Sequence, residues 1–303
     1  MNRMNAYSKR LLKKLPLVAS YLQRRHQRSR FSVERSLING THHNENRHPS
    51  IIHFSVHKSA TQYTKNILRR CASQNGMVPV GVPDYAFHTD FPYLDRLSAT
   101  EMRKYQHIFK PTGYLYSFFG GMIEGIPALE AYKVLLMVRD PRDALVSHYY
   151  SLAYSHPAPE PESGKYAEFM NVREMARRLS VDEYVLARSD GVYGTLDRYR
   201  KLLLEKYPNT YVTRYEEMTA DFETWLNRLL NACRLIITDE LRQSLLDENA
   251  RLKPKGEDVH RHIRKGRPGD FREKLRAETI DQLNAKFGPT LEIFGYAWEG
   301  LRR

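Results

Sequence analysis

Three separate stretches of the sequence carry cationic and hydroxyl side chains of the kind that bind phosphate. The first lies between a predicted strand and a predicted helix, where the unpaired N–H groups of a helix start attract anions. Its residues are His57, Lys58, Ser59, Ala60, Thr61, Gln62 and Tyr63. An ordinary exposed helix start is the alternative. The pattern G-x-x-x-x-G-K-[ST], which a nucleotide kinase would carry, does not occur.

The second stretch begins with Arg139 and includes Ser147, eight residues later. Arg139 follows an unbroken apolar run that predicts a buried parallel strand, and ligands of open α/β sheets bind at the carboxyl ends of such strands. Ser147 lies two turns into the helix expected next. The two side chains would together hold a second phosphate. The alternative is an ion pair of Arg139 with Asp140 or Asp143.

The third stretch is Arg264-Lys265-Gly266-Arg267-Pro268-Gly269-Asp270-Phe271, in which two cations precede a glycine. A glycine lets the backbone approach an anion closely, while arginine offers a forked donor and lysine a point charge. This stretch therefore predicts a third phosphate contact, with a solvated basic loop as the alternative.

The pattern of apolar residues predicts the elements that position these stretches. From residue 51 onward, short apolar runs alternate with helical periodicities, which predicts an α/β fold with a central parallel sheet flanked by helices. Strands are predicted at 51–56, 107–110, 132–138 and 210–215. Helices are predicted at 64–72, at 141–153, around 196–203 and from 270 onward.

Capping residues mark two predicted helix starts and one helix end. Asp140 is expected to cap the helix that Pro141 begins. Asp270 and Glu273 have the spacing of a capping box for the late helix, and Gly288 is expected to end it.

The composition predicts one large folded domain, because 41% of the 303 residues are hydrophobic. No apolar run approaches the roughly eighteen residues of a membrane-spanning helix, and the first thirty residues lack the apolar core of a secretory signal. We therefore expect a cytoplasmic protein. Cys71 and Cys233 are expected to be buried apolar groups, and no cluster of metal ligands stands out.

The net charge of +13 is concentrated in two segments. Residues 1–50 carry eleven Lys and Arg against two Glu, so we divide the chain into a basic extension and linker at 1–50 and a nearly neutral domain at 51–303. Residues 8–30 would make a weak contact with an anionic membrane surface, or form a solvated extension. Residues 251–276 carry ten Lys and Arg against four Asp and Glu, which fits a small anionic ligand rather than a specific nucleic acid.

Taken in order, the three stretches resemble the motifs of the sulfotransferase family that uses 3′-phosphoadenosine 5′-phosphosulfate (PAPS). That family has a Lys-Ser-Gly-Thr string, an Arg with a Ser eight residues later, and an Arg-Lys-Gly-x-x-Gly-Asp-Trp loop. Tyr215 also begins a Tyr-Glu-Glu-Met string that resembles the family's Tyr-Glu-Asp-Met near the adenine. The resemblance covers roughly residues 51–298 and implies a P-loop-like strand-loop-helix site for phosphate.

The resemblance implies in-line transfer of a sulfuryl group from PAPS to a hydroxyl or amine, without a metal. Lys58 would stabilise the leaving phosphate, and residues 59–63 would hold the 5′-phosphate. The 3′-phosphate would be bound by Arg139, Ser147, Arg264 and Lys265, with Gly266 in the loop that closes over it.

Two departures from the family pattern fall in the first stretch. Ala60 replaces a glycine, which is tolerated if that position has a negative φ. Tyr63 replaces a tryptophan that stacks on adenine, and it keeps an aromatic face.

The family's general base is a histidine just after a Lys-Thr pair, and it is missing here. Lys110 matches the lysine of that pair, so the resemblance implies charge stabilisation by Lys110. His88 is our first candidate for the base, ahead of His107 and Glu124, since a loop beyond the first helix would reach an acceptor.

The acceptor is expected to be a small molecule or a glycan. The aromatic residues between 114 and 119, with Gly120 and Gly121, would form a wall for it, although core packing explains the same residues. A catalytically silent nucleotide-binding scaffold remains an alternative to the enzyme, and a nucleotide kinase a weaker one.

Overall fold

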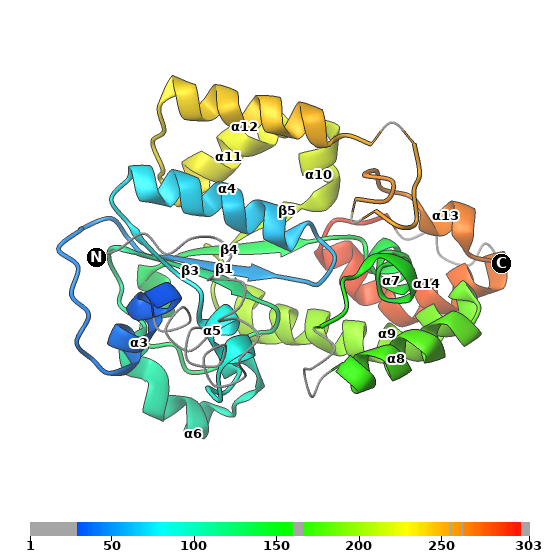
Figure 1. The fold of residues 1–303 in the computed structure, drawn as a ribbon, viewed down its shortest axis with the longest axis horizontal. Coiled ribbons are helices and arrows are strands. Elements are labelled where there is room, and N and C mark those ends of the chain that lie inside the picture. Colours follow the sequence, from blue (N-terminus) through cyan, green and yellow to red (C-terminus); the bar gives the residue numbers. More distant parts are fainter. Residues whose placement is uncertain (1–28, 160–165, 255, 262, 298–303) are drawn as a thin grey trace, which may run out of the picture.

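The computed structural model describes residues 29–159, 166–254, 256–261 and 263–297. Its centre is a five-stranded parallel sheet with the strand order β2-β3-β1-β4-β5 (Figure 1). The strands are β1 (Ile51–Ser55), β2 (Val78–Val80), β3 (Tyr114–Phe119), β4 (Lys133–Val138) and β5 (Tyr211–Arg214). The prediction of an α/β fold with a parallel sheet is confirmed.

Helices cover both faces of the sheet (Figure 1). On one face lie α4 (Thr61–Gln74), α11 (Phe222–Cys233) and α12 (Asp239–Leu252), and on the other lie α9 (Val181–Tyr199) and α14 (Ala277–Ile293). Successive side chains of a strand point to opposite faces. In β1, therefore, Ile51 packs with the first group of helices and Ile52 with the second.

The remaining elements surround these layers. They are α3 (Ser32–Ile38), α5 (Val82–His88), α6 (Ala99–Met102), α7 (Pro141–Tyr150), α8 (Tyr166–Arg178), α10 (Tyr215–Ala220), α13 (Phe271–Lys274), the 3-10 helices Leu94–Arg96, Arg103–Ile108 and Leu129–Ala131, and the π-helical turns Ser151–Ser155 and Arg200–Leu204.

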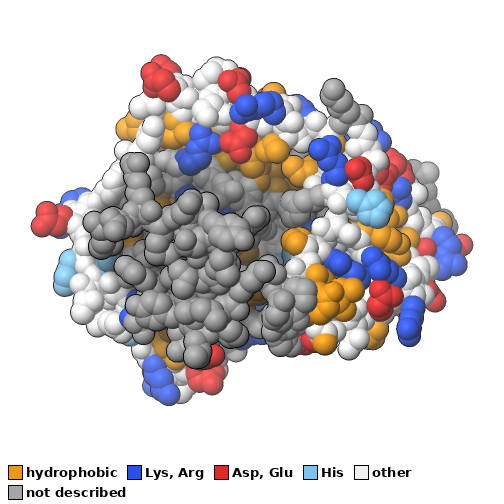
Figure 2. All heavy atoms as spheres, in the orientation of Figure 1, with side chains coloured by type: hydrophobic (Ala, Val, Ile, Leu, Met, Phe, Trp, Pro, Cys, Tyr) orange, Lys and Arg blue, Asp and Glu red, His pale blue; other side chains and the backbone are white. Residues whose placement is uncertain are grey.

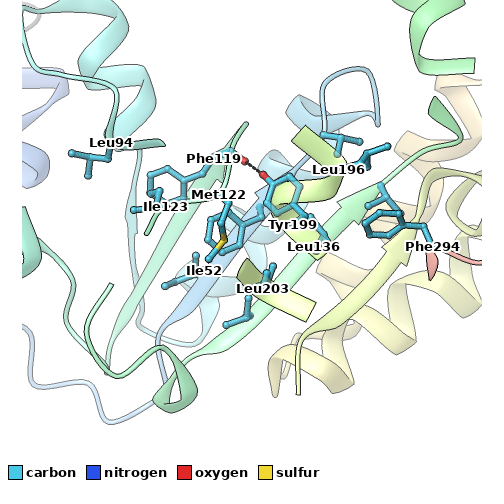
Figure 3. Packing of buried hydrophobic residues seen from close by; sticks show 14 of the residues in the cluster. Ile52, Leu94, Phe119, Met122, Ile123, Leu136, Leu196, Tyr199, Leu203 and Phe294 are labelled. Atoms are coloured by element: carbon cyan, nitrogen blue, oxygen red, sulfur yellow. Dashed lines mark hydrogen bonds between the residues drawn. The ribbon is translucent and has the colours of Figure 1, made fainter. Parts of the chain in front are cut away.

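Buried side chains fix α9 and the turn after it to the sheet (Figure 3). Tyr199, at the end of α9, is fully buried, and its hydroxyl donates to the Phe119 carbonyl of β3 at 3.2 Å. Leu203 lies beside Ile52 and Leu136 in the same cluster. This packing places α9 under the carboxyl ends of the central strands.

The prediction of a strand at 107–110 is wrong. The first half of that segment belongs to the 3-10 helix Arg103–Ile108, and the strand is β3, in the aromatic stretch after it. The Tyr116 hydroxyl donates to the Ile108 carbonyl at 2.8 Å and accepts from the Lys110 N–H at 2.8 Å. These bonds satisfy the phenol, so the aromatic strand lies in the core as our core-packing alternative expected.

Of the three residues predicted to mark helix ends, the structure confirms one and differs at two. The Asp140 carboxylate accepts from the Arg142 N–H at 3.0 Å, which confirms it as the cap of α7. Asp270 makes no capping bond, because its carboxylate is bound by the side chains of the preceding loop. Gly288 lies inside α14, which ends at Ile293 before Gly295 with φ +73°.

Residues 39–50, which fall within the extension and linker expected at 1–50, lie along the amino-terminal ends of the strands. The Asn44 amide donates to the Gly113 carbonyl and the Asn46 amide to the Asn75 carbonyl, both at 2.7 Å. Residues 1–28, including most of the basic segment at 8–30, lie outside the described residues. Among the residues described, no helix is long and apolar enough to cross a membrane.

The charges on the described surface are mixed. On the face shown in Figure 2, acidic and basic side chains are interspersed rather than separated. This agrees with the nearly neutral charge of residues 51–303. Both cysteines are buried, as predicted.

Candidate functional site

The loop between β1 and α4 forms the floor of the site. It leaves the carboxyl end of β1, where the Val56 N–H donates to the Met137 carbonyl of β4 at 3.0 Å. The Thr61 hydroxyl, at the first position of α4, lies 2.9 Å from the Ser55 hydroxyl, so these two residues join the ends of the loop. The first-turn N–H groups of α4 have no partner within the helix and point into this loop.

The backbone of this loop is left-handed at two non-glycine residues. Lys58 has φ +71° and Ala60 has φ +57°. The condition given for tolerating alanine at this position, a negative φ, is therefore not met, and Ala60 takes the conformation for which glycine is favoured. A left-handed non-glycine residue costs of order 1 kcal/mol, which the surrounding bonds must offset.

Arg139 leaves the carboxyl end of β4 and crosses to the same loop. Its Nη1 donates to the Lys58 carbonyl at 3.0 Å, and its guanidinium lies 4.3 Å from the ring centre of Tyr215. The nearest carboxylate, that of Asp143, is 3.8 Å from Nη2. The Arg139 side chain is therefore held by a carbonyl and an aromatic face, with only a long ion pair.

The third stretch is docked on α7 by Asp143. This buried carboxylate accepts from the Gly269 N–H at 2.7 Å and the Phe271 N–H at 2.9 Å. Within the loop, Arg264 and Lys265 both pair with Asp270. Sequence reasoning considered Asp143 only as a partner of Arg139, and it missed this link between the second and third stretches.

The positive charges of the second and third stretches act on the ammonium group of Lys58. Burial, followed by the positive charges of Arg139 and Arg264, lowers the pKa of Lys58 to about 8. Within the described part of the chain, no carboxylate lies within 4 Å of the Lys58 ammonium. Cations brought this close without a carboxylate on the central one form a site for an anion.

Two buried polar atoms support the same conclusion. The Ser59 hydroxyl and the Arg139 Nε atom are buried, and neither has a hydrogen-bond partner among the described residues. Such atoms normally have a partner, so their presence beside Lys58 fits a ligand with several acceptor oxygens. The residues present therefore fit a phosphorylated nucleotide.

A cavity of about 220 Å³ opens beside Lys58, between α7 and α9. Its wall is mostly apolar, with four polar side chains besides Lys58 and Arg139. The described lining residues are Val56, His57, Lys58, Arg139, Pro141, Ala144, Leu145, His148, Arg188, Gly191, Val192, Thr195 and Leu196. Sequence reasoning placed His57 in the first stretch but considered neither His57 nor His148 as a base, since only the fold brings them to a common cavity.

A family model for the sulfotransferase domain matches residues 49–295. The chain belongs to the sulfotransferase domain family. This confirms the resemblance seen in the sequence and the class of enzyme, a PAPS-dependent sulfotransferase. No curated protein matches the chain in a sequence comparison.

The structure search matches solved structures at low sequence identity, and the first of them shares this fold. Mouse sulfotransferase SULT7A1, complexed with PAP, is 15% identical with a TM-score of 0.51, and the match covers 86% of this chain and 89% of that one. Retinol dehydratase, in complex with androsterone and the inactive cofactor PAP, is 15% identical with a TM-score of 0.47 over 87% and 85%. Sulfotransferase STF9 from Mycobacterium avium is 12% identical with a TM-score of 0.48 over 90% and 82%.

The other residues expected to bind the donor differ in burial and packing. Tyr63, on α4, packs its ring 6.0 Å from that of Phe222, while Gln62 is exposed. Ser147 is half-buried on α7. Gly266 has φ +67°, and a Cβ there would lie 2.7 Å from the Pro254 side chain, so this position requires glycine.

The structure does not bring Lys110 to the site, which corrects the prediction for this residue. Pro111 and Thr112 lie beside Pro49 and Ser50, at the amino end of β1. Lys58 follows the carboxyl end of the same strand. The match to the family's lysine fails because β3 begins after Lys110, where the sequence suggested a strand before it.

The base candidates chosen from the sequence also lie elsewhere. His88, the last residue of α5, packs its ring 5.7 Å from that of Phe31 and is not among the residues that line the cavity. The His107 ring contacts the Ile38 carbonyl at 2.8 Å, and Glu124 pairs with Arg198 at 3.0 Å. The histidines that do line the cavity are His57 and His148.

Proposed function

We propose that this sulfotransferase binds PAPS across the Lys58, Arg139 and Arg264 stretches and transfers its sulfuryl group to an acceptor in the adjoining cavity. The convergence of three cations from separate parts of the chain, with an unpaired lysine at the centre, is the observation that carries the proposal. A nucleotide with phosphate groups at two positions matches this charge. The mouse neighbour, whose structure contains PAP, has the same fold.

Each stretch has a separate role in the proposed site. PAPS, when bound, supplies the sulfuryl group. The Lys58 ammonium stabilises the charge that develops on the leaving phosphate, and the Ser59 hydroxyl and the first-turn amides of α4 hold the 5′-phosphate. Arg139 and Ser147 bind the 3′-phosphate together with Arg264 and Lys265.

The cavity favours a small, mostly apolar acceptor with a hydroxyl or amine. Its volume of about 220 Å³ exceeds the roughly 150 Å³ of an engineered cavity that binds benzene, so one aromatic ring with substituents fits. The apolar side chains of Leu145, Val192 and Leu196 line it, and Lys58 and His57 mark the end where transfer would occur. Glycans, which present mostly hydroxyls, match this wall less well.

The test is transfer from PAPS labelled in its sulfuryl group to a panel of phenols, alcohols, amines and glycans. We expect product with small phenols or alcohols, and a loss of at least about a hundredfold in Lys58→Ala, because the charge on the leaving group is then uncompensated. Lys110→Ala is the matched control and should retain transfer.

Two outcomes would contradict parts of the proposal. Equal product from the wild type and Lys58→Ala would remove the role of Lys58. Binding of the product nucleotide PAP without transfer to any member of the panel would favour the silent scaffold. A wild type that does not bind PAP would exclude the proposed donor site at Lys58, Arg139 and Arg264.

A further inference from the structure

Gly120, at the carboxyl end of β3, makes room for a histidine. A Cβ at this position would lie 3.0 Å from His57 Nε2 and 3.2 Å from its Cε1. Gly120 does not have a positive φ, so its backbone conformation does not require glycine. The imidazole lies so close to this position that an added Cβ would force it to move by a few tenths of an ångström.

Asp95 lies on the same side of this glycine pair. Its Oδ2 is 3.9 Å from the position of a Gly120 Cβ, and it accepts from the Gly121 N–H at 3.0 Å. A Cβ at Gly121 would lie 3.1 Å from the same oxygen. The two glycines therefore leave space for an imidazole and a carboxylate that is anchored to the backbone.

Asp95 also provides the negative charge that a protonated imidazole needs. Desolvation in the cavity and the positive charges of Lys58 and Arg96 lower the pKa of His57, whereas Asp95 raises it. The imidazole is thus neutral at neutral pH and has a carboxylate nearby when it gains a proton.

The second histidine of the cavity lacks this arrangement. A ring nitrogen of His148, Nδ1, lies 2.6 Å from the Tyr184 hydroxyl. Burial lowers the pKa of His148 to about 4, and the charges of Lys58 and Arg188 act in the same direction. Burial and both positive charges therefore disfavour the protonated form of His148.

We propose that His57 is the general base of the sulfuryl transfer and that Asp95 positions it. As the acceptor oxygen forms its bond to sulfur, its proton moves to a ring nitrogen of His57. The bond from sulfur to the bridging phosphate oxygen breaks, and its electron pair stays on that oxygen, next to Lys58. This role rests on the proposed function, and it replaces the missing family histidine by the residue directly before Lys58.

The test compares His57→Gln with His88→Gln on two acceptors at pH 8. Benzyl alcohol must lose its proton during transfer, whereas 4-nitrophenol is largely ionised beforehand. We expect His57→Gln to lower kcat for benzyl alcohol by about a hundredfold or more and to leave transfer to 4-nitrophenol largely intact. The affinity for PAP, measured by calorimetry, should not change, and His88→Gln should behave as the wild type.

Gly120→Ala tests the same geometry without removing the histidine. The added methyl displaces the imidazole, so the loss should again be selective for benzyl alcohol, and Gly194→Ala on α9, whose Cβ meets no atom within 4 Å, is the control. An NMR titration of the His57 ring measures the effect of Asp95 on the imidazole directly. The ring signal is assigned by its absence in His57→Gln. Asp95→Asn should move its midpoint to lower pH.

The outcomes separate this inference from the proposed function. Full benzyl alcohol transfer by His57→Gln, an equal loss with both acceptors, or an unmoved His57 titration in Asp95→Asn would overturn it while leaving sulfuryl transfer in place. A wild type that transfers to neither acceptor nor to the wider panel would overturn both.

Discussion

At the scale of single residues, the site depends on cations that the fold holds close together at a cost. Lys58 has a left-handed backbone, a lowered pKa and no carboxylate within 4 Å among the described residues. None of these features stabilises the folded chain by itself. They are explained if the lysine binds an anionic ligand, since backbone strain and buried charges that destabilise the fold are typical of functional sites.

Replacing Lys58 should therefore stabilise the protein while removing donor binding. The pKa of Lys58 falls from its ordinary value of 10.5 to about 8, so between these pH values the unfolded chain holds more protons and stability rises with pH. Below pH 8 the full cost of the charged lysine is present. We expect Lys58→Met to raise the free energy of unfolding at pH 7 by roughly 1–3 kcal/mol, a gain that disappears above about pH 10.5.

Chemical denaturation of the wild type, Lys58→Met and Lys110→Met at pH 7 and pH 10 would check this. Lys110→Met should follow the pH dependence of the wild type. A destabilised Lys58→Met at pH 7 would mean that the charge on this lysine is stabilised by the protein, contrary to the lowered pKa.

At the scale of elements, the sequence predicts those positions whose signal is local. The loop at 57–63 and Arg139 were found because each follows a buried strand and precedes a helix, and both were correctly placed at the carboxyl edge of the sheet. β3 was not found, because most of its residues are aromatic and show no alternation of apolar and polar side chains. The Tyr116 hydroxyl is buried among them because it is bonded to the Ile108 carbonyl and the Lys110 N–H. The misplaced strand then gave Lys110 a role that the structure does not support.

Contacts between distant elements were also beyond the sequence. His57 stands inside the first motif, yet its relation to Gly120 exists only because β1 and β3 are neighbours in the sheet. Likewise, Asp143 binds the Gly269 and Phe271 amides across a long separation in the chain. Such residues carry no local pattern, and their roles follow from topology alone.

Two glycines of α9 allow the acceptor cavity to be tested at this scale. Gly191 lines the cavity and Gly194 does not, and a Cβ at either would meet no atom within 4 Å. Alanine at either position should stabilise the helix by about 0.5–1 kcal/mol. Leucine at 191 should fill the cavity and raise the KM for the acceptor with little change in PAP affinity, whereas leucine at 194 should change neither constant.

Steady-state kinetics with varied acceptor, together with PAP calorimetry, would measure both effects. If Gly191→Leu left the KM of the acceptor unchanged, the acceptor would have to bind outside this cavity. The proposed acceptor class would then lose its support, while the donor site would stand.

At the scale of the whole molecule, the proposed donor site joins three parts of the chain that are otherwise linked through the sheet and α7. Lys58 follows β1, Arg139 follows β4, and Arg264 belongs to a loop that reaches α7 through Asp143. A ligand that touches all three binds only when these parts have assembled. Ligand binding should therefore be coupled to unfolding of the domain as a unit.

Thermal unfolding with and without PAP tests this coupling. At a PAP concentration of about 100 times its Kd, the stabilisation is about 2.7 kcal/mol. In a domain of roughly 250 residues, each kcal/mol raises Tm by about 2–4 °C, so we expect a shift of roughly 5–10 °C.

Adenosine 5′-monophosphate at the same concentration should give a much smaller shift, because it lacks the 3′-phosphate that Arg139 and Arg264 are proposed to bind. Arg139→Ala and Arg264→Ala should each reduce the PAP shift toward that smaller value. Equal shifts from the two nucleotides in the wild type would mean that these arginines do not bind the 3′-phosphate. A site that binds both phosphate groups must distinguish PAP from a nucleotide that carries only one of them.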